Sequence, residues 1–170
     1  TQNLVCGAPV TVTKQNLADG KARAVVCNSG IANTCNADGV EKARGMCEIT
    51  AKALGIAPTD VIVASTGVIG QPLDLSPVEQ GMPQLIGELS KAGSDHAAQA
   101  IMTTDTRKKE FALTFMLGGK GCTIGAISKG SGMIHPNMAT MLCFITTDVA
   151  ISTPMLQKAL SAAVADSFNM

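Results

Sequence analysis

The sequence predicts a mixed α/β fold, in which helices are layered on mixed sheets, and two observations support this prediction. Over the first hundred residues, short apolar segments typical of strands alternate with longer segments of helical spacing. Further along the chain, the apolar segments cluster and are separated mainly by turns. A length of 170 residues allows one domain with a sizeable apolar core.

The first strand and helix have clear sequence signals. Residues 22–27 form an apolar run that ends in the turn residues Asn28-Ser29-Gly30. Apolar residues then recur at loose helical spacing over 38–54, and Gly55 follows as a stop signal. We therefore expect a strand, a turn and a helix in this order.

A second strand and two more helices are expected next. Residues 61–64 are apolar and lead into the loop Ser65-Thr66-Gly67-Val68-Ile69-Gly70. The segments 77–91 and 96–102 have compositions that favour helices. This part of the chain thus repeats the alternation of strand and helix.

The last third of the sequence reads as clustered strands and one helix. Apolar and other residues alternate over 111–117, before a glycine-rich turn at 118–121. Two further buried strands are expected over 122–128 and 140–147. Thr153 followed by Pro154 predicts the N-cap and first position of a helix that continues to about residue 166.

Composition argues against several functions. Lysine plus arginine equals aspartate plus glutamate at 13 each, and the only aromatic residues are four phenylalanines, which does not favour nucleic-acid binding. No apolar run approaches the roughly 18 residues of a membrane helix. Six cysteines without a C-x-x-C pair, and two histidines, argue against a metal site and favour buried free thiols in a cytoplasmic protein. Because the sequence begins with Thr1, we expect a piece of a longer protein.

The glycine-rich turn at 118–121 invites a phosphate-binding interpretation, but the pattern is incomplete. Neither the serine or threonine that follows the lysine of a P-loop nor the third glycine of a dinucleotide motif is present. A hairpin turn is the simpler interpretation.

Thr140 raises a different possibility. A threonine hydroxyl needs a base, and the α-amine of an N-terminal threonine can supply one. Cleavage after the small residue Ala139 would create that amine, and a loop containing Gly130, Gly132 and Pro136 would allow Thr140 to attack the preceding carbonyl. The alternative is that Thr140 merely begins a strand, where threonine is common.

Three other segments have both a functional and an ordinary interpretation. Thr66 and Gly67 could form an oxyanion hole or a plain strand-to-loop turn. Thr103, within Thr103-Thr104-Asp105-Thr106, could contact a substrate or serve in capping and turn formation. Lys129 could bind a carboxylate or be a solvated lysine.

Taken together, these segments resemble the ornithine acetyltransferases (glutamate N-acetyltransferases) of arginine biosynthesis. Residues 130–142, GSGMIHPNMATML, resemble the self-cleavage segment of that family, and residues 64–70, ASTGVIG, resemble its oxyanion segment. Residues 101–106 and 128–130 resemble its substrate-binding segments, and residues 24–33 also match. The resemblance extends over the whole sequence in order.

This resemblance implies a self-processing enzyme with its own α/β fold, chemically similar to N-terminal-nucleophile hydrolases. Residues 1–139 would be an α-chain portion and residues 140–170 the start of a β chain, with cleavage between Ala139 and Thr140. Thr140 would carry the acetyl group from N2-acetylornithine to glutamate. The other implied site residues are the oxyanion donors Thr66 and Gly67 and the substrate-binding residues Thr103 and Lys129.

The resemblance also implies an α2β2 heterotetramer and neither metal nor organic cofactor, with acetyl-CoA as a possible second acetyl donor. The family's sequences extend before Thr1 and beyond Met170, and His135 is assigned no role. Two alternatives stay open at this point. One is a self-processing aminopeptidase or amidase of the same chemistry, and the other is an inactive, unprocessed fragment.

Overall fold

The computed structural model describes residues 3–135 and 141–170. The chain forms two compact units, of which one comprises Leu4–Gly93 and the other Ser94–Met170 together with Asn3. The mixed α/β class predicted from the sequence is confirmed, because helices accompany one parallel and one antiparallel sheet.

The unit Leu4–Gly93 is built on a parallel strand pair. Strand β1 (Ala24–Asn28) lies beside β2 (Val61–Ser65), with Ala24 opposite Val61 and Asn28 opposite Ser65. Parallel neighbours need a crossover connection, and helix α2 (Gly39–Leu54) provides it. The loops that follow the two strands therefore begin at the same edge of the sheet.

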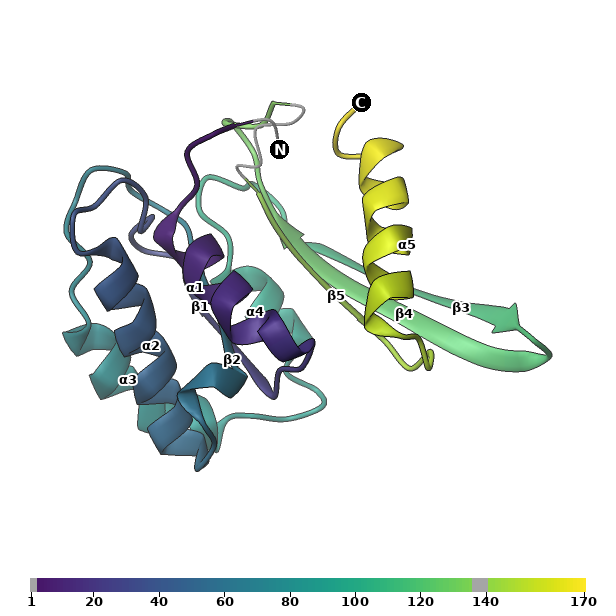
Figure 1. Cartoon of the computed structure of the whole chain (residues 1–170), viewed down its shortest axis with the longest axis horizontal. Coiled ribbons are helices and arrows are strands. Elements are labelled where there is room, and N and C mark those ends of the chain that lie inside the picture. Colours follow the sequence, from purple (N-terminus) through teal and green to yellow (C-terminus); the bar gives the residue numbers. More distant parts are fainter. Residues whose placement is uncertain (1–2, 136–140) are drawn as a thin grey trace. The chain divides into compact units, whose positions relative to one another are not determined.

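Helices α1 (Ala8–Asn16) and α2 cover the apolar residues of this strand pair, and a third helix extends the core. Helices α1 and α2 pack on the strands, and α3 (Ser76–Gly87) packs against α2 (Figure 1). Single 3-10 turns, η1 (Leu17–Asp19) and η2 (Pro58–Asp60), precede β1 and β2. The core consists of Val12, Val26, Ala43, Met46, Cys47, Ala51, Val61, Val63, Leu73 and Met82.

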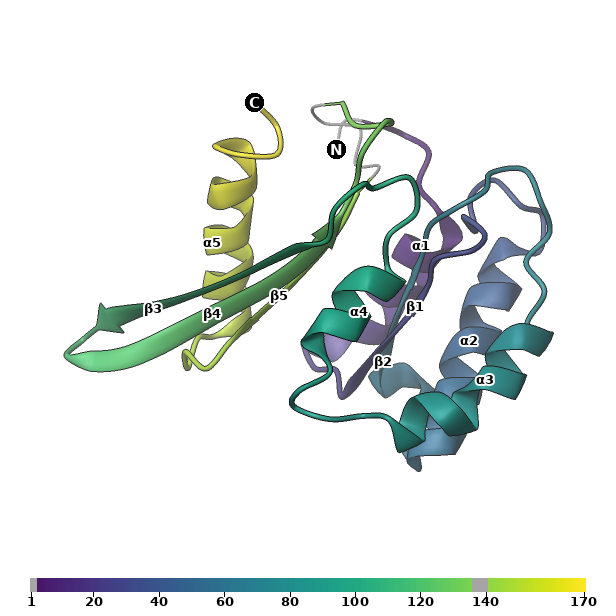
Figure 2. The ribbon, with the colours of Figure 1, turned by 180° about the vertical axis from the view of Figure 1, so that it is seen from behind.

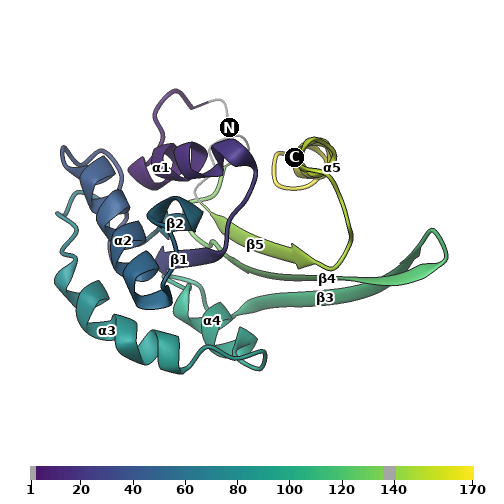
Figure 3. The ribbon, with the colours of Figure 1, turned by 60° about the horizontal axis from the view of Figure 1, so that its bottom comes forward.

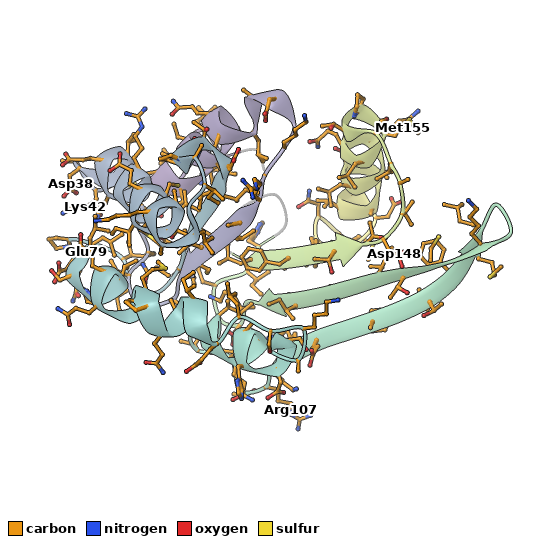
Figure 4. The ribbon with its side chains drawn as sticks, turned by 90° about the horizontal axis from the view of Figure 1, so that it is seen from below. Asp38, Lys42, Glu79, Arg107, Asp148 and Met155 are labelled. Atoms are coloured by element: carbon orange, nitrogen blue, oxygen red, sulfur yellow. The ribbon has the colours of Figure 1, made fainter. Side chains whose placement is uncertain are left out.

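Helix α2 has the amphipathic pattern that its sequence predicts. Ala43, Met46, Cys47, Thr50 and Ala51 are buried, a spacing that places them on one face. The helix ends at Gly55, whose φ of 67° is in the left-handed region that glycine tolerates best. At its start, Lys42 lies 3.9 Å from Asp38 one turn earlier, and Figure 4 shows the two residues near each other.

The unit that begins at Ser94 contains a three-stranded antiparallel sheet in the order β3-β4-β5. Its strands are β3 (Lys109–Leu117), β4 (Lys120–Lys129) and β5 (Leu142–Thr147). Gly118 and Gly119 connect β3 to β4 with φ of 56° and 78°, so the glycine-rich segment is the tight hairpin turn predicted as its simpler interpretation. Figure 2 shows this hairpin as a long two-stranded ribbon.

Two helices complete this unit. Helix α4 (Ser94–Ala100) packs against β3 and β4, and α5 (Thr153–Ala165) is seen end-on beside the sheet in Figure 3. The turn into α5 is fixed by Asp148, labelled in Figure 4, whose Oδ1 accepts a hydrogen bond of 2.8 Å from the backbone N–H of Thr123.

Helix α1 was not predicted by the sequence pattern, because its β-branched residues are more typical of a strand. Tertiary contacts hold it instead. The Thr13 hydroxyl donates to the carbonyl of Val63 at 2.9 Å and accepts from the Val63 N–H at 3.1 Å. The Asn16 amide donates to the carbonyl of Val61 at 2.8 Å. These bonds attach α1 to β2, which a reading of local propensity alone does not detect.

Several predicted boundaries differ from the structure. The helix expected to reach residue 91 ends at Gly87, and a turn in which Gly93 donates to the carbonyl of Ser90 follows. The N-cap of α5 is Ser152 rather than Thr153. The strands β4 and β5 are only partly buried, although the sequence predicts buried strands.

The cysteine prediction is correct in one part and wrong in another. All six cysteines are free thiols, but only Cys47 is buried, whereas Cys6 and Cys35 are exposed. Burial raises the pKa of the Cys47 thiol to about 11, against a smaller opposing effect of the hydrogen bond from Asn16. Cys47 is therefore a core residue held in its unreactive, protonated form.

Candidate functional site

Thr103 and Lys129, which the sequence marks as separate candidates, lie in direct contact. Lys129 is the last residue of β4 and is only 5% exposed, so the interpretation of a solvated lysine is wrong. Its Nζ donates a hydrogen bond of 2.8 Å to the Oγ1 of Thr103, which follows α4 and is exposed. The pair joins the end of β4 to the loop after α4, and 26 positions separate the two residues in the sequence.

The chemistry of this pair follows from its donors. A lysine ammonium donates hydrogen bonds and accepts none, so Thr103 Oγ1 must accept from Lys129. The hydroxyl hydrogen of Thr103 is then directed away from Lys129, so the hydroxyl can donate it to another acceptor. An ammonium shielded from water also attracts an anionic group more strongly than one in bulk solvent. The pair thus suits a ligand that carries carboxylate or carbonyl oxygens.

The side chain of Asp105 accepts hydrogen bonds from backbone N–H groups in both segments that carry this pair. Its Oδ1 accepts a hydrogen bond of 2.9 Å from the N–H of Gly130, and its Oδ2 accepts one of 3.3 Å from the N–H of Thr103. The side chain is fully shielded from solvent and is ion-paired with Lys109 in β3. Sequence reasoning weighed this segment for substrate contact through Thr103 or for capping and turn formation, and gave Asp105 no role of its own.

The charge of Asp105 is stabilised in spite of its burial. Burial raises the pKa of a carboxyl group, but the hydrogen bond from Lys109 and those from the N–H groups of Gly130 and Thr103 act in the opposite direction. Together these bonds lower the pKa of Asp105 to about 2. Asp105 is therefore a carboxylate, and only an acceptor, at neutral pH.

Thr66 and Gly67 follow β2 in the other unit, Leu4–Gly93. The N–H of Thr66 donates to the carbonyl of Asn28 at 2.9 Å, and the N–H of Val68 donates to the carbonyl of Gly30 at 3.0 Å. Within the described residues, the N–H of Gly67 between them donates no hydrogen bond. The backbone donor available to a ligand here is therefore the N–H of Gly67, whereas the N–H of Thr66 is already bonded to Asn28.

Gly67 is required at its position by both conformation and space. Its φ is 127°, and a Cβ built on it would lie 2.2 Å from the carbonyl oxygen of Gly30. No side chain fits this close approach without displacing the facing backbone. The strand-to-loop turn considered in the sequence analysis is thus present, and the close approach to Gly30 restricts its third residue, Gly67, to glycine.

Asn28 fixes the loop against which Gly67 packs. Its Oδ1 accepts a hydrogen bond of 2.9 Å from the N–H of Gly30, and its Nδ2 donates one of 2.7 Å to the carbonyl of Ile31. This is an asparagine turn closed at both ends. Sequence reasoning identified Asn28 as a turn residue, but the parallel register that sets this turn beside Thr66 needed the structure.

Ala139 and Thr140 lie outside the described residues, so the cleavage site and the nucleophile stay predictions. The strand that follows them is described, and its first residue, Leu142, pairs with Lys129. The chain boundary expected between residues 139 and 140 therefore falls between two paired strands of one unit.

Beside the Thr103–Lys129 pair, the described residues place a single carboxylate, that of Asp105. Arg107, labelled in Figure 4, is exposed and points away from the ribbon. Across residues 3–135 and 141–170, no group of His, Cys, Asp and Glu is arranged to hold a metal ion. Among the helices of the described part of the chain, none has the length and apolar character needed to cross a membrane.

The fold and these contacts define a mixed α/β protein with two groups of candidate ligand-binding residues, one in each unit. A family model described as the ArgJ family matches residues 1–170, and the chain belongs to that family.

Known relatives agree with this assignment. The arginine biosynthesis bifunctional protein ArgJ of Symbiobacterium thermophilum is 50% identical over 171 residues, which cover 100% of this chain and 42% of that protein. ArgJ 1 of Clostridium acetobutylicum is 51% identical with the same coverage. The chain thus spans about two fifths of the length of these curated relatives.

A solved structure supports the fold. The crystal structure of the arginine biosynthesis bifunctional protein ArgJ from Bacillus halodurans matches with a TM-score of 0.73 at 37% sequence identity. The match covers 84% of this chain and 74% of that one. The expected family and fold class are therefore confirmed.

Proposed function

We propose that this chain is part of a glutamate N-acetyltransferase of arginine biosynthesis, which moves an acetyl group from N2-acetylornithine to glutamate. The observation that carries the proposal is the buried Lys129 bonded to Thr103, in a chain that matches the ArgJ family from end to end. Relatives named arginine biosynthesis bifunctional proteins support the pathway.

The proposed reaction starts with self-cleavage between Ala139 and Thr140, which gives Thr140 a free α-amine as its base. The Thr140 hydroxyl attacks the acetyl carbonyl of acetylornithine, and the α-amine takes the hydroxyl proton. The C–N bond then breaks, the ornithine nitrogen receives that proton, and ornithine leaves. The amine of glutamate next attacks the acetyl ester, which restores the Thr140 hydroxyl and releases N-acetylglutamate.

The two described groups of residues have separate roles in this proposal. The N–H of Gly67 and the hydroxyl of Thr66 stabilise the oxyanion of each tetrahedral intermediate. Lys129 and Thr103 bind a carboxylate of the substrate, for which their hydrogen-bond donors are suited.

The strand pairing supports the proposed two-chain enzyme. Because β5 pairs with β4 from Leu142 opposite Lys129 to Thr147 opposite Ile124, cleavage before it would leave the two pieces joined by a strand ladder. We further propose that two such pairs assemble as an α2β2 heterotetramer in the cytoplasm and that catalysis uses no metal or organic cofactor.

A second activity is suggested by the word bifunctional in the names of the relatives. We propose acetyl-CoA as an alternative donor to Thr140, with glutamate again as acceptor. The same acetyl ester would serve both reactions, since only the leaving group differs.

The test is a transfer assay on the full-length protein with acetylornithine and glutamate. We expect ornithine and N-acetylglutamate in equal amounts with ping-pong kinetics, and no transfer by the Thr140→Ala variant. Ornithine release that does not require glutamate would instead indicate the aminopeptidase or amidase alternative. No product from folded protein would indicate the inactive, unprocessed fragment.

A further inference from the structure

We propose that Asp105 is a positioning residue, which holds Thr103 and Lys129 in the arrangement that binds substrate. The proposal rests on the proposed function, in which these two residues contact the substrate. Asp105 itself acts through the backbone on either side of them.

The geometry gives Asp105 contacts with two segments that are distant in the sequence. One oxygen accepts from the N–H of Thr103 itself, and the other accepts from the N–H of Gly130, the residue directly after Lys129. A single carboxylate thus fixes the backbone of the loop after α4 relative to the end of β4. The 2.8 Å contact between the Lys129 ammonium and the Thr103 hydroxyl depends on that spacing.

We call the hydrogen bonds that Asp105 accepts from the N–H groups of Thr103 and Gly130 the clamp, and its chemistry requires a carboxylate. Asp105 serves three donors, because Lys109 binds the same side chain as the two backbone N–H groups. An ionised carboxylate has acceptor sites for all three, whereas the amide of an asparagine has one oxygen and presents its own donors at the other position. Asp105→Asn therefore leaves one of the two backbone N–H groups, that of Thr103 or that of Gly130, without an acceptor.

A neighbouring ion pair provides a matched comparison. Lys108, adjacent to Lys109, pairs with Asp95, whose side chain is 47% exposed, whereas Asp105 is fully shielded. Both carboxylates belong to the same unit and pair with consecutive lysines. Only Asp105 also contacts the backbone on both sides of the substrate-binding pair, so Asp95→Asn removes a similar charge without loosening the clamp.

The experiment compares steady-state kinetics of the full-length protein and its variants. For Asp105→Asn we expect the KM for acetylornithine to rise about 10-fold with kcat changed much less, because the loss falls on substrate binding. Asp95→Asn should match the wild type. The double variant Asp105→Asn with Lys129→Met should bind no worse than Lys129→Met alone, since both changes disable the same contact.

Two results would overturn the proposal. One is a folded Asp105→Asn variant with unchanged KM, and the other is a double variant whose loss is the product of the two single losses. If Asp105→Asn does not fold, Lys109→Met decides, because it alters only the partly exposed ion-pair partner of Asp105. A raised KM for Lys109→Met together with faster amide exchange at Gly130 supports the proposal, whereas faster exchange with an unchanged KM rejects it, because the contact with Asp105 is then loosened without an effect on binding.

Failure of the proposed function has a different signature. In that case the wild-type protein itself transfers no acetyl group from acetylornithine. Amide hydrogen exchange at Gly130 then still tests the clamp, because its N–H is bonded to Asp105 and should exchange faster in Asp105→Asn than in Asp95→Asn.

Discussion

Lys129 donates a hydrogen bond of 2.8 Å to Thr103, although 26 positions separate the two residues in the sequence. The contact forms because the antiparallel hairpin β3–β4 brings the end of β4 back to the start of β3, next to the loop that precedes β3. It turns a lysine that would otherwise be solvated into a buried donor with a fixed direction.

Replacing Lys129 by methionine should weaken substrate binding. Methionine keeps much of the apolar stem but removes the charged donor, and a hydrogen bond to a charged group contributes about 1.5–3 kcal/mol. We expect the KM for acetylornithine to rise about 10-fold to 100-fold. Lys120→Met, in the exposed first position of the same strand, serves as the control and should leave the kinetics unchanged. Equal kinetics for both variants would contradict the role of Lys129.

Removing the Thr66 hydroxyl should slow the chemical step. The N–H of Thr66 is already bonded to the carbonyl of Asn28, so the role that we propose for Thr66 falls on its hydroxyl. Thr66→Val should lower kcat by about 10²–10³, the usual cost of losing one oxyanion donor. Thr66→Ser keeps a hydroxyl and should recover most of the rate. A valine variant that is as fast as the serine variant would exclude this role.

Gly67→Ala should destabilise the protein more than Gly70→Ala. Both glycines have positive φ, 127° and 86°, so each substitution carries a conformational cost of roughly 1–2 kcal/mol. A Cβ on Gly67 would also lie 2.2 Å from the Gly30 carbonyl oxygen, whereas a Cβ on Gly70 would meet no atom within 4 Å. We expect the difference to appear as a lower unfolding midpoint in urea for Gly67→Ala. Equal midpoints would contradict the prediction, because they would show that the loop containing Gly30 shifts to accommodate the Cβ without a loss of stability.

Asp105 should contribute to stability against acid. Its pKa in the folded protein, about 2, lies below the value near 3.9 of an unfolded chain. The native state thus favours the ionised form, and this contribution is complete above about pH 4 and is lost as the pH falls toward 2. Unfolding free energies measured from about pH 5 down to about pH 2 should fall less for Asp105→Asn than for the wild type. Parallel pH profiles would contradict this prediction.

Cleavage between Ala139 and Thr140 should leave a complex that survives native conditions. Strand β4 precedes the cleavage point and β5 follows it. The two strands are paired along Leu142–Thr147, so their hydrogen bonds would join the two pieces. We expect two species in a denaturing mass measurement, with one beginning Thr140-Met141-Leu142, and a single species in native mass spectrometry. Thr140→Ala should give one uncleaved species in both, and Thr140→Ser should still cleave.

The sequence alone determined the fold class, the order of most elements and the residues to examine. Its apolar periodicity predicts α2, β1, β2 and the strand β3 of the hairpin, because helical and strand periods differ and each can be read from neighbouring residues. The motif resemblance identified the family from several segments together. Single motifs such as Thr66-Gly67 stayed ambiguous, since a turn and an oxyanion loop use the same residue types.

Only the tertiary structure decided which residues act together. Local propensity does not predict α1, which the hydrogen bonds from Thr13 and Asn16 to β2 hold in place. The burial of Lys129, the Asp105 clamp and the close approach of Gly67 to Gly30 likewise depend on strand register. Register brings together groups that the chain separates, and its energy comes from packing and hydrogen bonds between distant segments. The sequence thus named Thr103 and Lys129, and the structure showed what joins them.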